Sequence, residues 1–109
     1  MNEETHFVQV NVNPGVCGFE CVIKAWQHEA RMVKVAISES KCKQIQRMSE
    51  HLNEMTLNEI FAPVSRNLAF VFATEAGCHS SCPVPVAVLK AAEVAMKMAL
   101  PRDVHIHFP

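Results

Sequence analysis

The sequence predicts an α+β fold, in which a four-stranded, mainly antiparallel sheet carries helices packed on one face. Apolar residues alternate with polar ones in the early part of the chain and again at its end, which is typical of strands. Between these parts, apolar residues recur at helical spacing behind capping signals. The expected order of elements is β-β-β-α-α-α-β, within a single domain over residues 1–109.

The three early strands are predicted over residues 6–12, 19–25 and 33–37, each with apolar side chains on one face. Turn residues over 13–18 and a polar segment over 27–30 separate them, so the strands should form an antiparallel meander. The face opposite the core also carries large apolar side chains. We therefore expect a second subunit, and so a homodimer, to cover Phe7, Trp26 and Met32.

The first helix should begin behind Ser38 and Ser40, which are good N-cap residues, and carries Cys42 in its first turn. A short helical turn is expected over residues 56–61. Residues 63–76 fit either a helix or a strand by periodicity; we favour a helix, ended by Gly77 in the left-handed conformation.

A long helix is expected over residues 83–100, since its first turn carries prolines and Pro101 ends it. Its few charged residues form a narrow stripe, so protein should cover most of its sides. The last strand is expected over residues 103–108. Its alternation points Val104, Ile106 and Phe108 inward and leaves His105 and His107 on a solvated outer face.

Composition excludes several classes of function. The net charge is −1 and the basic residues are scattered, which argues against a nucleic-acid surface. The polar start of the chain is no secretory signal, and no apolar run approaches the ~20 residues that a membrane span needs. Only three glycines are present, which makes a nucleotide loop improbable. We expect a cytoplasmic protein without membrane or nucleic-acid partners.

The most informative feature is the placement of five cysteines, an odd number that does not suit a disulfide framework in a reducing compartment. Cys78 and Cys82 lie before the long helix, Cys17 and Cys21 flank a glycine-containing turn, and Cys42 begins the first helix. Helix starts and turns present unpaired backbone N–H groups, which stabilise thiolates. The pattern therefore suggests metal ligation or thiolate chemistry.

Our leading hypothesis is a metal site. Cys17, Cys42 and Cys82, with Cys78 or His79, could hold zinc or an iron–sulfur cluster if the turn and the two helix starts meet at one end of the sheet. Cys21 shares its strand face with apolar residues, so we interpret it as a core residue.

The segment Cys82-Pro83-Val84-Pro85, which opens a helix with a lysine further along, resembles the motif of the TusA-like sulfur-carrier family. The resemblance implies that Cys82 is the catalytic nucleophile, which carries a persulfide and exchanges sulfur with a donor or acceptor protein, while Cys78 could resolve it. In that family the motif lies near the N-terminus, whereas here it lies late in the chain. The segment also resembles that of an uncharacterised family of short microbial cysteine-containing proteins, which implies no activity.

Three hypotheses thus remain open: a metal protein, a sulfur carrier, and a structural oligomeric module whose cysteines are buried and inert. The sequence leaves open whether the protein turns over any substrate.

Overall fold

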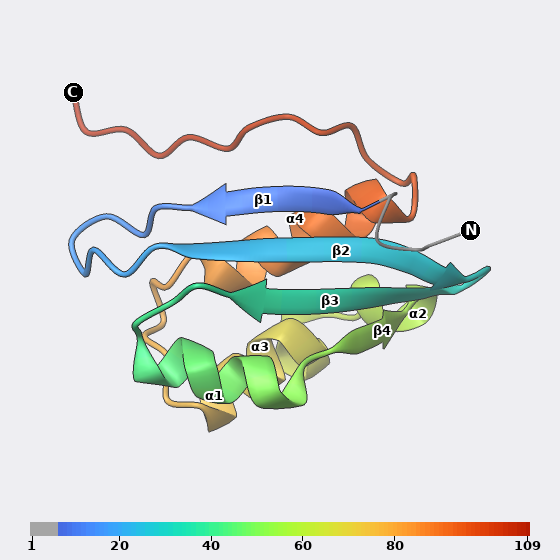
Figure 1. Cartoon of the computed structure of the whole chain (residues 1–109), viewed down its shortest axis with the longest axis horizontal. Coiled ribbons are helices and arrows are strands. Elements are labelled where there is room, and N and C mark those ends of the chain that lie inside the picture. The colour runs from blue at the N-terminus through green and yellow to red at the C-terminus, as the bar shows by residue number, and fades with distance from the viewer. Residues whose placement is uncertain (1–6) are drawn as a thin grey trace.

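The computed structural model describes residues 7–109, so the predicted strand start at His6 lies outside the described part of the chain. Four antiparallel strands form one sheet in the order β1-β2-β3-β4, and the helices follow or interrupt the later strands (Figure 1). The predicted α+β class is confirmed. The strands are β1 (Val8–Val12), β2 (Cys21–Glu29), β3 (Met32–Ser38) and β4 (Glu54–Thr56).

The register of the sheet places the predicted inward residues of the first three strands on one face, except Phe19, which precedes β2 and is exposed. Val10 lies opposite Ile23, which lies opposite Ile37. Ile23 is fully buried, whereas Trp26 on the other face is only half-buried. The alternation in the sequence is therefore the alternation of a sheet covered by helices on one face.

The helices are α1 (Lys43–His51), α2 (Leu57–Ile60), the 3-10 turn η2 (Val64–Arg66), α3 (Leu68–Glu75) and α4 (Val84–Ala95). Helix α4 packs mainly on β2 and β1, α1 packs on β3, and α3 contacts both helices. Among the described residues, no helix is both long enough and apolar enough to cross a membrane.

Asn67 is buried at the start of α3 and satisfies its polar groups completely. Its side-chain nitrogen donates to the carbonyls of Glu59, Ile60 and Ala62 at 3.3, 3.1 and 3.1 Å, and its side-chain oxygen accepts from the Ala69 N–H at 3.1 Å. One side chain thus caps α3 and ties it to the segment behind α2. This confirms a helix, rather than a strand, within residues 63–76.

Several expected boundaries differ from those observed. The second strand begins at Cys21 rather than at residue 19, and it continues to Glu29 through most of the segment expected to separate it from the third strand. Helix α1 begins directly after its N-cap residue, Cys42, so neither Ser38 nor Ser40 is the N-cap. The Ser40 hydroxyl accepts a hydrogen bond of 3.1 Å from the Cys42 backbone N–H. Helix α4 ends at Ala95, five residues before the expected end, because Lys97 adopts a positive φ of 62° that the helix cannot continue through.

The strand expected over residues 103–108 does not form, and this prediction is wrong. Residues 101–109 are exposed and contain no assigned helix or strand. The fourth strand is β4, whose Met55 lies opposite Val33 and is fully buried. Three residues are too few to show an alternation, whereas residues 104–108 alternate but pair with no strand of the described chain.

Candidate functional site

The cysteines converge on one end of the sheet from three separate connections. Cys17 lies in the β1–β2 loop and Cys21 begins β2; Cys42 is the N-cap of α1, behind β3; Cys78 and Cys82 lie between α3 and α4. Figure 1 shows these three connections at the same end of the molecule. Antiparallel pairing brings the start of β2 beside the end of β3, as the Val22–Ser38 pair shows. We call these five residues the cysteine site.

Cys78 is positioned by the way α3 ends. Gly77 adopts a φ of +82°, its N–H donates to Thr74, and the Cys78 N–H donates to the Ala73 carbonyl at 2.9 Å. These two hydrogen bonds form a Schellman motif, which turns the chain back at a fixed angle. The Cys82 N–H then donates to the His79 carbonyl at 3.1 Å, so Cys78 and Cys82 are held on one tight turn.

Cys42 is half-buried and packs against the core, and its Sγ lies 3.2 Å from Oε1 of Gln44. Cys78 and Cys82 also pack partly against the core, Cys21 is 2% exposed, and Cys17 is exposed. Four of the five thiols therefore lie at the boundary between the core and solvent or just beneath it.

The thiols lie close enough to act on one another electrostatically. The pKa of Cys21 is raised from 9.0 to about 11, mainly by burial and to a smaller extent by negative charge at Cys82 and Cys42. Burial likewise raises the pKa of Cys78 to about 11, with smaller upward contributions from Cys82 and Cys42. A negative charge at Cys82 or at Cys42 therefore favours the neutral forms of Cys21 and Cys78.

The Cys82 thiol interacts with each of the other four cysteines of the site. Burial raises its pKa, as do charges at Cys42 and Cys17, while hydrogen bonds from the Val84 backbone N–H and from the Cys78 thiol oppose the rise. The expected stabilisation by the helix start is therefore present in the Val84 hydrogen bond, but burial outweighs it. Pro83, not Cys82, occupies the N-cap of α4.

Arg47 on α1 is the cation that acts on this region: its charge lowers the pKa of Cys78 against the larger effect of burial. Its guanidinium also donates a hydrogen bond of 2.8 Å to the Ala76 carbonyl, one residue before Gly77. The positive charge is thereby fixed beside the turn that carries Cys78.

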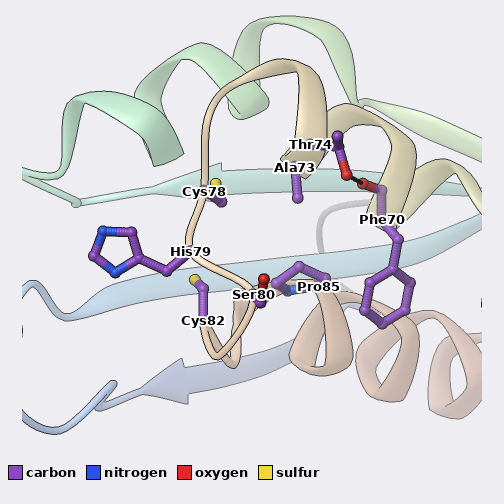
Figure 2. Close-up of a pocket in the computed structure, with 8 residues that line it drawn as sticks. All are labelled: Phe70, Ala73, Thr74, Cys78, His79, Ser80, Cys82 and Pro85. Atoms are coloured by element: carbon purple, nitrogen blue, oxygen red, sulfur yellow. Dashed lines mark hydrogen bonds between the residues drawn. The ribbon is translucent and has the colours of Figure 1, made fainter.

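A pocket of about 180 Å³ lies beside Cys78 and Cys82. Figure 2 shows both cysteines on the connection between α3 and α4, with His79 extending away from Phe70 and Pro85. The His79 side chain is exposed. The pocket lining consists of Phe70, Ala73, Thr74, Cys78, His79, Ser80, Cys82 and Pro85.

The arrangement is wider than a site for a single ion. Within residues 7–109, no three His, Cys, Asp or Glu side chains are grouped closely enough to hold one metal ion. A zinc site needs Zn–S bonds of about 2.3 Å and so draws its thiolates tightly together.

Sequence reasoning missed one member of the site. We interpreted Cys21 as a core residue, and it is buried as expected, but its thiol also interacts with Cys82 and Cys42. Periodicity along one strand could reveal its inward orientation. It could not reveal that the first residue of β2 lies beside the starts of α1 and α4.

The fold and the cysteine site define a small α+β protein with a convergent set of thiols. The chain belongs to a family of unknown function, DUF6951, whose model matches residues 8–108 and so spans the whole site. No curated protein and no solved structure is significantly similar to it.

Proposed function

We propose that the protein binds an iron–sulfur cluster through Cys21, Cys42, Cys78 and Cys82. The observation that carries the proposal is the convergence of these four cysteines, from three separate connections, on one end of the core. Four cysteine thiolates are the usual ligands of such clusters.

A cluster suits the spacing better than zinc does. The thiolate ligands of a cluster bind several iron atoms instead of one ion. They therefore stand farther apart than the ligands of a single ion. That agrees with thiols that influence one another without forming a compact group for a single metal ion.

The electrostatics of the site make the binding of iron depend on pH. Raised pKa values keep Cys21, Cys78 and Cys82 as neutral thiols at neutral pH. Iron among them would favour the thiolates and release their protons, so binding should be stronger at higher pH. Packing against the core would shield the cluster from water on one side.

The test is iron and acid-labile sulfide content, with the visible absorption spectrum, after anaerobic purification and after reconstitution with iron and sulfide. We expect stoichiometric iron and sulfide in the native protein, and loss of both in Cys42→Ser, Cys78→Ser and Cys82→Ser. Cys17→Ser is the matched control, because Cys17 is exposed and acts on Cys82 alone among the shifted thiols. Protein that takes up neither iron nor sulfide would overturn the proposal. Stoichiometric zinc without sulfide would show that the site binds zinc and not a cluster.

A second candidate function is sulfur transfer, favoured by the Val84 N–H that hydrogen-bonds Cys82 beside the pocket. The Cys82 thiolate would attack the outer sulfur of a donor persulfide, breaking the donor S–S bond to give a Cys82 persulfide and the donor thiol. Cys78 could then attack the inner sulfur of Cys82, forming a disulfide and releasing hydrosulfide.

This candidate predicts a mass increase of one sulfur atom on Cys82 after incubation with a persulfide donor. It also predicts that Cys82→Ser abolishes the increase, while Cys42→Ser retains it. The absence of any such adduct would exclude sulfur transfer, and slow alkylation of all buried thiols in a metal-free protein would support the inert structural module.

A further inference from the structure

The C-terminal tail, residues 101–109, is an extended segment whose apolar side chains have no cover in the described structure. Val104, Ile106 and Phe108 are 58%, 84% and 90% exposed. They alternate with His105 and His107, so an extended tail has one apolar face and one polar face. Such a pattern is that of a half-buried strand that lacks a partner.

The sheet has an unpaired edge at β1, a strand in which apolar and polar residues alternate as they do in the tail. Among the described strands, β1 pairs only with β2, which leaves its other edge free. An exposed edge usually carries a charge or a proline that discourages pairing, and β1, with the sequence Val-Gln-Val-Asn-Val, has neither. The opposite edge of the sheet, β4, is only three residues long.

The two segments match residue by residue in polarity. Val8 and Val10 of β1 face the core side but remain half-exposed, while Gln9 and Asn11 are exposed on the other face. A strand beside β1 would add apolar groups next to the valines and polar groups next to Gln9 and Asn11. The tail, with Val-His-Ile-His-Phe over residues 104–108, supplies that alternation over the same length.

The direction of the tail indicates which molecule supplies the strand. In Figure 1 the tail lies on the β1 side of the sheet and runs in the same direction as β1, without pairing with it. An antiparallel neighbour for β1 must therefore run against this chain's own tail. The tail of a second copy, related by a two-fold axis perpendicular to the strands, does so.

We propose that two copies of the chain exchange their tails, with residues 104–108 of each pairing antiparallel with β1 of the other. The exchange is reciprocal: because β1 and the tail of one chain run in the same direction, both exchanged pairs are antiparallel together. Opposing Val10 to Ile106 matches the two segments over their full length. A register shifted by one residue would turn the histidines toward the core and is disfavoured.

The test is the molar mass in solution, measured by light scattering and sedimentation over a range of concentrations. We expect a dimer for the native chain. Ile106→Lys should raise the dissociation constant of the dimer by about 100-fold or more. The substitution removes an apolar side chain that the dimer would bury and places a charge in the new strand pair. His105→Gln is the matched control on the polar face and should change the constant by no more than about twofold.

The identity of the occupant is tested with a peptide of residues 101–109. This peptide should bind the Ile106→Lys protein, whose β1 edge is left open, and the same peptide carrying the substitution should not. Ile106 is so exposed that its replacement leaves the folded monomer intact, which far-UV circular dichroism verifies. A native chain that is monomeric at all concentrations, or a dimer that Ile106→Lys leaves unchanged, would overturn the proposal.

Discussion

The Arg47 guanidinium donates a 2.8 Å hydrogen bond to the Ala76 carbonyl and thereby joins α1 to the end of α3. The last carbonyls of a helix have no partner within the helix, so this bond satisfies one of them with a positive charge at the favourable end. Cys42 is the N-cap of α1, which carries Arg47, and Cys78 lies two residues after Ala76, the C-cap of α3. The contact therefore fixes Cys42 and Cys78, two residues of the cysteine site, relative to each other.

Arg47→Met should lower the free energy of unfolding by about 1–2 kcal/mol, since a charge-assisted hydrogen bond is lost. It should also raise the pKa of Cys78 further, because the Arg47 charge that lowers the pKa of that thiol is removed. Urea unfolding measures the first effect, and the pH dependence of Cys78 alkylation measures the second. Lys43→Met, which removes an exposed charge from the same helix, should change neither; an equal effect of both would contradict the role of Arg47.

Gly77→Ala should destabilise the protein by about 1 kcal/mol, because alanine is strained at the φ of +82°. A Cβ at Gly77 would have only ordinary contacts, at 3.8 Å from Arg47 and 3.9 Å from Gln44, so backbone strain is the whole cost. Since the same turn positions Cys78, we also expect weaker iron uptake. Gly15→Ala at a φ of +88° supplies similar strain away from that turn, and it should leave iron uptake unchanged.

Asn67→Ala should lower the free energy of unfolding by about 2–3 kcal/mol. The substitution leaves buried carbonyls and the Ala69 N–H without their partner, and it removes the cap of α3. The urea midpoint is the measurement. Asn58→Ala, at an exposed position, should cost far less, and comparable losses at both sites would show that the buried network contributes little.

The sequence predicts best those elements whose pattern repeats over several turns or several alternations. The three long strands are of this kind, and in each the burial of alternate residues has one dominant solution. Residues 63–76 are not, because their periodicity fits a helix or a strand, and the buried Asn67 cap accompanies the helix that forms. Residues 104–108 show the limit of this reasoning: a perfect alternation predicts a strand, but it does not show whether a strand of the same chain pairs with it, and here none does. Conversely, β4 is formed by tertiary contact of Met55 with the core, which no local pattern reveals.

The cysteine site shows a similar division between local and tertiary information. Thiols at a turn and at two helix starts could be recognised along the chain, and their convergence followed from the expected topology. The ionisation of Cys82 could not be predicted, because a helix start lowers the pKa of a thiol whereas burial raises it. Which effect dominates depends on the packing of α3 and α4 around the turn.

Alkaline pH should destabilise the metal-free, reduced protein. Cys21 and Cys78 have pKa values of about 11 in the folded state, against 9.0 for an unperturbed thiol. Above pH 9 the unfolded chain releases these protons while the folded chain retains them, so the free energy of unfolding falls until about pH 11. Below pH 9 both states hold the protons, and the stabilisation is fully present. Cys21→Ala should make the decline between pH 9 and 11 shallower, because one of the thiols with a raised pKa is removed. Val35→Ala, which also removes buried volume but no ionisable group, should lower stability at every pH and leave the slope unchanged. If Cys21→Ala left the slope as steep as in the native protein, the buried thiol would not be the source of the pH dependence.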